Sequence, residues 1–507
     1  MILRPYQEDA VACVRAAFVA GKRAVMLVAM TGSGKTVVAS RIIELAIAKG
    51  TRIIFASHRR ELVAQASRKL RDIGVQHGVI AAGQPGYAPH EKVQVCSIQT
   101  LRARPNERPP AELIIFDECH HCRCGSFQSL REYYPAARVV GLTATPIRND
   151  GRGLGEMFDA LVSVSSPSKL IAGGFITDVE GYAYDRPDLE GVEKVGADYN
   201  EKQLGQVMGD VKLTGSIVGQ WKAHASHLKT VCFCVHIEHS QQLAEAFRDA
   251  GVNAEHLDGT MPAEQRDAIL ARLHSGETRV VCNCNVLSEG WDEPTVGCVV
   301  LARPTMSLAL ALQFAGRSLR PACYACGEAT DPRLPTCQRC GSTNIKRLAR
   351  LHDHAGIVVH WGLPTSDRQW TLEKDGIISS GKGAQSVRTC KRCFAVYLST
   401  AQACPRCGFR NPKVLKTVCE LDGQAISLAE AAARAQPTGP VHTSKENKQQ
   451  HYFHLLKICR LKGRKIGWAS HCFMGKYNEW PPREWQVEFE PWFAAWRKSH
   501  PETESAS

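Results

Sequence analysis

A glycine turn set between an apolar run and a candidate helix marks the first part of the chain. Residues 24–36 read AVMLVAMTGSGKT. A buried strand, a glycine turn and a helix start, in this order, are typical of a phosphate-binding loop. Backbone N–H groups around Gly32 and Gly34 can surround phosphate oxygens, Lys35 can reach the terminal phosphates, and Thr36 can ligate Mg²⁺. The loop predicts a nucleoside triphosphate site; a Gly/Ser turn without a ligand is the alternative.

Length and composition limit the class of protein. At 507 residues the chain is too long for one core, so two or three domains are expected, and 44% apolar residues support globular cores. No apolar run approaches the roughly 18 residues of a membrane span, and the first residues lack the pattern of a signal peptide. We therefore expect a cytoplasmic protein without a membrane segment. A net charge of +13 fits a polyanionic partner without proving one.

Apolar runs recur after the glycine loop, with helical stretches such as residues 60–70 between some of them. The runs lie at residues 52–56, 93–96, 113–116 and 139–142. Near-continuous apolar strands that alternate with helices indicate a parallel sheet covered on both faces. We expect one α/β domain over residues 1–160.

Adjacent carboxylates follow the run that ends at residue 116. Asp117 can hold Mg²⁺ while Glu118 orients or deprotonates the attacking water. A solvated acidic turn is the alternative for this pair taken alone.

A second group of apolar runs predicts a second parallel α/β domain. These runs lie at residues 230–235, 256–261, 279–284 and 298–301, and residues 351–360 read as a further strand. Residues 161–220 read as a connector with a helical entry into this domain.

In this order the motifs resemble the superfamily 2 helicases of the DExH type, in the branch of type III restriction-enzyme motor subunits and phage-type helicases. The matching segments are residues 3–7, 29–36, 117–120, 143–145, 285–292 and 313–320. The resemblance implies two RecA-like domains in tandem and a nucleic-acid-dependent ATP hydrolase. It also implies DNA as the track, held without strong sequence specificity, in a bacterial, prophage or phage context.

The resemblance assigns roles residue by residue. The nucleotide would be bound by Gln7, Thr31, Gly32, Ser33, Gly34, Lys35, Thr36, Gly290 and Asp292, with Mg²⁺ on Thr36 and Asp117. The catalytic residues would be Lys35, Asp117, Glu118, Arg317 and Arg320. The nucleic-acid backbone would be held by Ser57, His58, Arg59, Gln99 and Thr100. Hydrolysis would be coupled to movement by His120, Thr143, Thr145 and Gln313.

Arg317 and Arg320 are candidates for arginine fingers. They stand three residues apart, so one helix face would present both across a cleft to the terminal phosphate. Such a finger is worth about 10³ to 10⁵ in turnover. An exposed basic helix face is the alternative. ATP binding would close the cleft between the domains and hydrolysis would open it.

Eight cysteines form two quartets of one spacing, Cys-x₂-Cys, ten residues, Cys-x₂-Cys. The quartets are Cys323, Cys326, Cys337 and Cys340, then Cys390, Cys393, Cys404 and Cys407. Four thiolates at this spacing predict a structural, tetrahedral Zn²⁺ site in each quartet, with redox pairs as the alternative. A nucleic-acid or protein contact and a purely stabilising role both stay open for these knuckles. Cys119, Cys122 and Cys124 overlap the motif at Asp117 and are not counted as a third metal site.

The C-terminal region offers two interpretations. Residues 445–476 are basic and carry Tyr452, Phe453, Trp468 and Phe473. This pattern suits strand binding by charge and base stacking, and it equally suits a small helical domain with a solvated face. We expect a helix start at residues 427–430 and disorder over residues 501–507.

These observations give one organisation and one function. The expected parts are residues 1–160 and 221–365 as the two RecA-like domains, 161–220 as connector, 321–349 and 390–410 as zinc knuckles, 366–389 as linker and 411–507 as a mostly helical auxiliary region. The expected function is an ATP-dependent DNA helicase or translocase using ATP, Mg²⁺ and Zn²⁺. An RNA helicase, a zinc-dependent scaffold, and a motor subunit that acts only with a nuclease partner are the alternatives; a protein partner would bind the knuckles or the C-terminal region.

Overall fold

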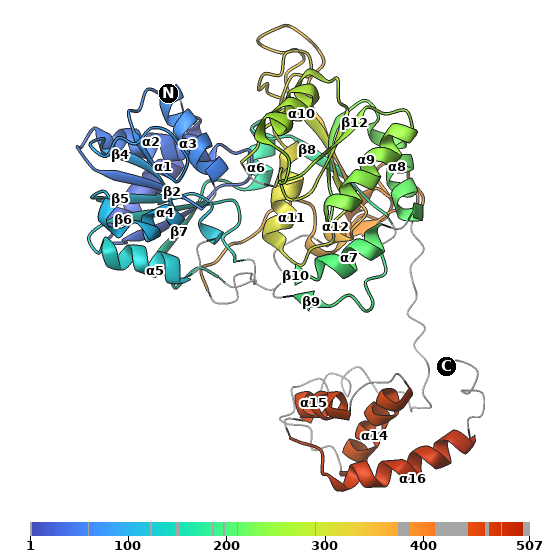
Figure 1. Cartoon of the computed structure of the whole chain (residues 1–507). Coiled ribbons are helices and arrows are strands. Elements are labelled where there is room, and N and C mark those ends of the chain that lie inside the picture. The colour runs from blue at the N-terminus through green and yellow to red at the C-terminus, as the bar shows by residue number, and fades with distance from the viewer. Residues whose placement is uncertain are drawn as a thin grey trace, which may run out of the picture. The chain divides into compact units, whose positions relative to one another are not determined.

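The computed structural model describes residues 3–58, 60–121, 124–148, 153–184, 187–195, 198–209, 211–288, 290–373, 386–410, 445–461, 466–477 and 479–499. It divides into two compact units, Met1–Lys413 and Val414–Ser507. The larger unit contains two parallel sheets in tandem, each covered by helices (Figure 1), which confirms the expected fold class. Within the described ranges, no helix is long and apolar enough to cross a membrane.

Seven parallel strands form the first sheet in the order β3-β4-β2-β5-β6-β1-β7. Their bounds are β1 Ala24–Val28, β2 Ile53–Ser57, β3 Gly78–Ile80, β4 Val93–Ser97, β5 Leu113–Phe116, β6 Arg138–Thr143 and β7 Ala160–Ser163. The expected strands of this sheet each coincide with one of these. Because β1, β5 and β6 are close neighbours and run in parallel, the loops that follow them meet at one edge. That edge carries the glycine loop and the carboxylate pair.

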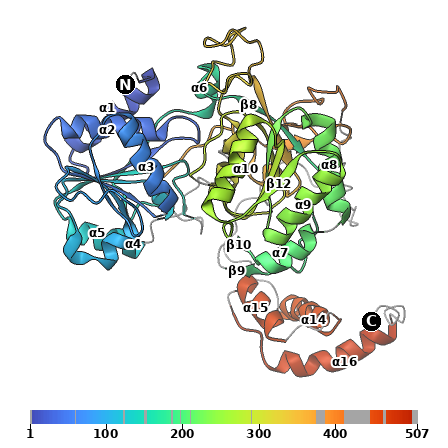
Figure 2. The ribbon, with the colours of Figure 1, turned by 45° about the horizontal axis from the view of Figure 1, so that its top comes forward.

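Helices cover both faces of this sheet (Figure 2). Their bounds are α1 Pro5–Val19, α2 Lys35–Ile47, α3 Arg60–Asp72, α4 Ile98–Ala103 and α5 Cys124–Tyr133, with 3-10 turns η1 Pro105–Glu107 and η2 Cys119–His121. Val14 of α1 and Val63 of α3 join an apolar cluster on one face, whereas Leu101 of α4 and Leu130 of α5 join a cluster on the other. Burial on both faces explains why the strands are apolar at nearly every position.

The second sheet has the order β12-β13-β11-β14-β15-β8, again with parallel neighbours. Its strands are β8 Asp178–Ala183, β11 Lys229–Phe233, β12 Ala254–Leu257, β13 Val280–Asn283, β14 Val296–Leu301 and β15 Leu348–Asp353. The accompanying elements are α6 Pro167–Ala172, β9 Lys194–Val195, β10 Asp198–Tyr199, α7 Glu201–Met208, α8 Val211–Ala225, α9 Ile237–Asp249, α10 Ala263–Ser275, α11 Leu308–Ala315, η3 Gly316–Ser318 and α12 Ile357–Trp361. Trp221 of α8 and Phe247 of α9 pack on one face; Leu273 of α10 and Phe314 of α11 pack on the other.

Two segments differ from the sequence-based expectation. The strand expected over residues 351–360 ends at Asp353, because that buried carboxylate accepts hydrogen bonds from the N–H groups of Ala355 (3.0 Å) and Val358 (2.7 Å) and so starts α12. Residues 161–220, expected as a connector, also supply most of β7 to the first sheet and the edge strand β8 to the second.

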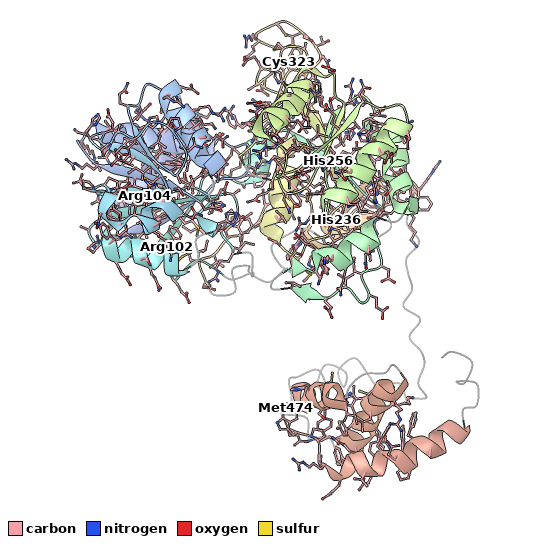
Figure 3. All side chains as sticks on the ribbon, viewed as in Figure 1. Arg102, Arg104, His236, His256, Cys323 and Met474 are labelled. Atoms are coloured by element: carbon pink, nitrogen blue, oxygen red, sulfur yellow. The ribbon has the colours of Figure 1, made fainter. Side chains whose placement is uncertain are left out.

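Both cysteine knuckles belong to the second domain. The first, which carries Cys323 (Figure 3), is inserted in the chain between β14 and β15, and these two strands are still direct neighbours in the sheet. The second contains the hairpin of β16 (Val387–Thr389) and β17 (Val396–Leu398) and packs on β8, where Ala183 N–H donates to Phe394 O at 3.0 Å. It thereby covers an otherwise open sheet edge.

The chain returns from the second domain to the first after α12. Trp370 and Leu372 pack against the apolar cluster on the α5 face of the first sheet. Asp367 accepts hydrogen bonds from Ser168 N (2.9 Å) and Ser168 Oγ (2.6 Å) near the start of α6. A second stretch of chain, besides the one that carries α6, therefore joins the two domains.

The smaller unit contains three described helices, α14 (Lys445–Leu461), α15 (Ile466–Tyr477, which includes the Met474 of Figure 3) and α16 (Glu484–Ser499). Tyr452, Phe453 and Phe473 are buried in the core of this unit. Their assignment to base stacking is therefore wrong, and the alternative of a small helical domain holds. The Trp468 side chain, the helix start expected at residues 427–430 and residues 501–507 lie outside the described part.

Candidate active site

The glycine loop connects β1 to α2 and is held by the first helix. Gly34 has a φ of +86° and precedes α2, and a Cβ there would lie 2.3 Å from Gln7 Nε2, so glycine alone fits. Gln7 Nε2 donates to Ser33 O at 3.2 Å, and Tyr6 Oη donates to the same oxygen at 2.8 Å. The predicted adenine-binding residue Gln7 thus lies directly against the predicted phosphate loop.

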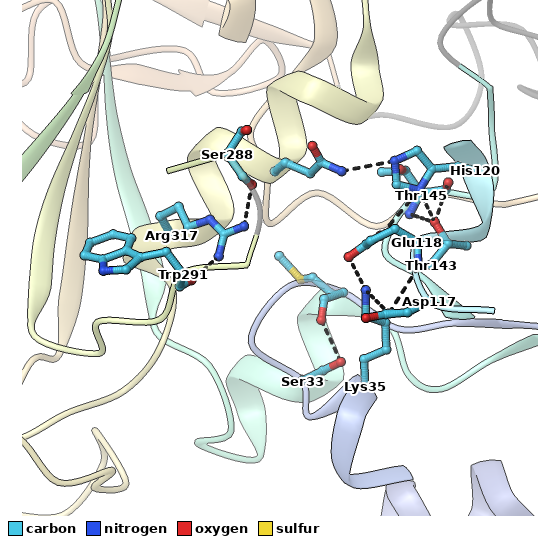
Figure 4. A network of polar contacts seen from close by, with 12 residues as sticks. Ser33, Lys35, Asp117, Glu118, His120, Thr143, Thr145, Ser288, Trp291 and Arg317 are labelled. Carbon is cyan, nitrogen blue, oxygen red and sulfur yellow. Dashed lines mark hydrogen bonds and ion pairs between the residues drawn. The ribbon is translucent and has the colours of Figure 1, made fainter. Parts of the chain in front are cut away.

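Lys35 lies between the two carboxylates. Its Nζ donates to Glu118 and stands 3.3 Å from Asp117 Oδ1 (Figure 4). Burial by itself would lower the pKa of Lys35, but the charges of Asp117 and Glu118 outweigh it and raise that pKa, while burial raises the pKa of Asp117. Glu118 has a φ of +49°, a strained value for a residue with a side chain. The arrangement is a charged site under local strain.

A chain of hydrogen bonds links the two domains beside this site. Thr143 Oγ1 donates to Thr145 O at 2.8 Å, so it accepts from His120 Nδ1 at 3.0 Å. His120 Nε2 then accepts from Gln313 Nε2 at 3.1 Å, and Gln313 belongs to α11 of the second domain. Only the tautomer with a proton on Nδ1 satisfies both contacts. The four residues predicted to couple hydrolysis to movement are therefore adjacent, Thr145 through its backbone. Figure 4 shows His120, Thr143 and Thr145 of this set.

The two arginines do not share a helix face. α11 ends at Ala315; Arg317 lies in the 3-10 turn η3 and Arg320 lies beyond it. Arg317 donates to the backbone oxygens of Ser288 and Trp291 within its own domain (Figure 4). The expected common helix face is therefore wrong, because a tighter turn replaces the α-helix at this point.

Arg320 is paired with Asp292 and approaches the glycine loop. Its Nη1 donates to Asp292 Oδ1, and its Cγ would lie 3.2 Å from a Cβ built on Gly32. Burial and the Asp292 charge act in opposite directions on the pKa of Arg320, and burial prevails and lowers it.

Most of the residues predicted for the nucleotide, and all of those predicted for catalysis, line one cavity of about 400 Å³ between the domains; Gln7 and Ser33 are not part of its lining. Its lining includes Thr31, Gly32, Gly34, Lys35, Thr36, Asp117, Glu118, Gly290, Asp292, Gln313, Arg317 and Arg320. Sequence reasoning missed several further lining residues, among them Arg4, Lys69 and Phe175. Arg4 stands in the segment of Gln7 and carried a signal, and its guanidinium lies 4.9 Å from the Phe175 ring. Lys69 and Phe175 lie in no recognisable motif.

The candidate contacts to nucleic acid divide into two sets. Gln99 Nε2 donates to His58 O at 2.7 Å, and Gln99 is exposed. Ser57 and Thr100 are buried, and Thr100 Oγ1 accepts from Ala82 N at 3.3 Å. Arg59 lies outside the described residues. Both ring nitrogens of His58 are buried, so Gln99 is the described member of the set that is open to a ligand.

Each cysteine quartet closes into a compact cluster. In the first, Cys323 Sγ lies 3.6 Å from Cys340 Sγ, and Cys326 Sγ lies 3.7 Å from Cys337 Sγ; the second has the same two separations between its corresponding pairs. A Zn–S bond of about 2.3 Å in a tetrahedron places sulfurs about 3.8 Å apart. The clusters fit a tetrahedral metal, and within the described residues no other group of potential ligands is as compact.

Both sheet domains match families of known proteins. Residues 1–148 match the family model described as type III restriction enzyme, res subunit, and residues 213–322 match the helicase conserved C-terminal domain. The chain is 28% identical over 386 residues to a 51.5 kDa protein of a Lactococcus phage, covering 76% of this chain and 77% of the relative.

Two fungal relatives are described as putative ATP-dependent helicases. Identity is 31% to IRC3 of Saccharomyces cerevisiae and 30% to mitochondrial irc3 of Schizosaccharomyces pombe, each over 63% of this chain. The chain spans about half of each fungal relative, 49% and 55%. Because residues 1–148 and 213–322 match these two family models and the chain has two parallel sheets in tandem, it belongs to the superfamily 2 helicases, a family of nucleic-acid-dependent ATPases.

Proposed function

We propose that this protein hydrolyses ATP in the cavity between its two domains and uses the cycle to move along or unwind DNA. The observation that carries the proposal is the convergence of Lys35, Glu118 and Arg320 from both domains on that cavity. Each of these side chains has a charge suited to triphosphate hydrolysis.

The residues of the first domain bind and orient the substrate in this mechanism. Gln7 recognises the adenine edge, and the loop around Gly32 and Gly34 surrounds the phosphates with backbone N–H groups. Thr36 and Asp117 would hold Mg²⁺, which neutralises phosphate charge when bound. Glu118 orients the attacking water and accepts its proton.

The residues of the second domain complete the site. Arg320 lies beside the glycine loop, where its Cγ would be 3.2 Å from a Cβ built on Gly32, and this nearness supports Arg320 as the arginine finger. Arg317 shapes the loop of residues 290–292 through its hydrogen bonds to backbone oxygens. Lys35 must leave Glu118, and Arg320 must leave Asp292, before either cation can meet a phosphate. His120 and Gln313 transmit the presence of the nucleotide between domains.

Three further roles complete the proposal. His58, Gln99 and their neighbours hold the DNA backbone without reading bases. Each cysteine cluster holds one structural Zn²⁺, and the knuckles or the C-terminal helices take any protein partner. Since a phage protein is among the relatives, we place the activity in the cytoplasm of a bacterial or phage-infected cell.

The test is ATP hydrolysis by the full chain at one fixed, moderate salt concentration, alone and with single-stranded DNA, duplex DNA or RNA. Lys35→Ala should abolish the activity, whereas Lys49→Ala, an exposed lysine beyond α2, should retain it. Stimulation by DNA supports the proposal and identifies the track. Equal or greater stimulation by RNA would overturn the proposal that DNA is the track. No hydrolysis with any polymer would overturn the proposal that the chain works as a motor without a partner.

A further inference from the structure

Lys346 closes the base of the first cysteine knuckle. Its backbone N–H donates to Ala322 O at 2.8 Å, and the neighbouring residues Cys323 and Ile345 form a β-bridge. Its side chain is among the largest fully buried ones of the described chain, with a residue exposure of 1%. The knuckle thus fixes where this side chain enters the second domain.

The Lys346 ammonium holds the end of the loop that pairs with Arg320. Nζ donates to Pro294 O at 2.5 Å and to Val296 O at 2.9 Å. Pro294 follows Asp292 by two residues, and Asp292 accepts the hydrogen bond from Arg320. One side chain therefore connects the knuckle base to the segment that orients the arginine.

Burying a lysine to make this connection has a large desolvation cost. Its hydrogen-bond partners are backbone oxygens, and the charged groups that face it are Arg320, Glu293 and Asp292. Burial, together with the Arg320 charge, lowers the pKa of Lys346 to about 7 against the opposing carboxylates. An apolar residue would avoid this desolvation cost, so stability alone does not explain a lysine here.

We propose that Lys346 is a positioning residue for ATP hydrolysis: it ties the loop of Asp292 to the knuckle base, and this loop holds Arg320 beside the phosphate loop until a phosphate replaces Asp292 as the partner of Arg320. This inference rests on the catalytic role proposed for Arg320. It assigns the first knuckle a function at the nucleotide site, since the knuckle, whose four cysteines would hold Zn²⁺, is the anchor of Lys346.

The experiment compares Lys346→Met with a matched lysine. Lys229 donates to His274 O at 2.5 Å and to Thr295 Oγ1 at 3.0 Å, so it also holds this segment, yet it does not connect it to the knuckle. We expect Lys346→Met to lower DNA-stimulated kcat about tenfold with KM for ATP within about twofold, because small misplacements of a catalytic group cost rate. Lys229→Met should keep kcat within about twofold.

A double mutant separates positioning from general damage. In an Arg320→Ala background, Lys346→Met should lower kcat no further, because the group that it positions is gone. Equal losses in both backgrounds, or wild-type kcat in Lys346→Met, would overturn the inference. Normal turnover by Arg320→Ala would instead refute the catalytic role of Arg320. Zinc content and thermal melting identify a variant that has merely unfolded. Lys346→Gln keeps a hydrogen-bond donor, so a kcat closer to wild type in this variant than in Lys346→Met supports the inference.

Discussion

Replacing Gln313 with alanine removes the amide that donates to His120 Nε2 at 3.1 Å across the two RecA-like domains. Both side chains are buried, with exposures of 4% and 3%. Loss of one partner of a buried, neutral hydrogen bond costs about 1–3 kcal/mol. Because this contact joins the two domains, the same energy is lost from the coupling between polymer binding and ATP hydrolysis. A loss of this size corresponds to a reduction of about 5- to 150-fold in the stimulation of hydrolysis by the polymer.

The assay is the ratio of ATP turnover with saturating single-stranded DNA to turnover without it. We expect Gln313→Ala to reduce this ratio at least about fivefold while turnover without DNA changes less than about twofold. A double-mutant cycle with His120→Ala should show that the second substitution adds nothing to the first. An unchanged ratio, or independent losses that add up, would refute the coupling role of this contact.

Three further outcomes test other parts of the structure. Glu118→Gln should bind a fluorescent ATP analogue normally and release phosphate at least about 100-fold more slowly; near-normal release would remove Glu118 from catalysis. Cys390→Ser should lower the zinc measured in chelator-free protein by half, since it opens one of two clusters, and unchanged zinc would count against that site. His354, buried with a pKa lowered to about 3, stays neutral in the fold. Stability should therefore fall below pH 6.5 by about 1.4 kcal/mol per pH unit, or about 2.7 kcal/mol at pH 4.5. In His354→Leu, the free energy of unfolding measured by chemical denaturation should fall less steeply with decreasing pH, by about 1.4 kcal/mol per pH unit.

Local sequence signals predicted the parts of the site that directly follow a strand. β1, β5 and β6 are short apolar runs followed by polar motifs, and their loops meet because parallel neighbours end at one sheet edge. Lys35, Asp117 and Thr143 could therefore be brought together from the sequence.

Features set by tertiary contacts could not be predicted in this way. The spacing of Arg317 and Arg320 suggested a helix face, but carbonyl oxygens of residues 288 and 291 and the carboxylate of Asp292 hold them around a 3-10 turn. Aromatic residues such as Tyr452 follow the same pattern whether they stack on bases or fill a core, and only the packing of three helices decides. Lys346 has no motif, since its role depends on where the knuckle base meets β14.

The charges of the site also explain why nucleotide binding should draw the domains together. In this structure each cation is neutralised within its own domain, Lys35 by Asp117 and Glu118, and Arg320 by Asp292. At 3.3 Å and an effective dielectric constant of about 20, the Lys35–Asp117 attraction is about 5 kcal/mol. A triphosphate supplies comparable attraction to both cations at once, so binding exchanges two pairs within domains for contacts that span them. The net change in charge–charge energy is then small. The main effect of the exchange is that closure of the cleft depends on the terminal phosphate, which hydrolysis removes.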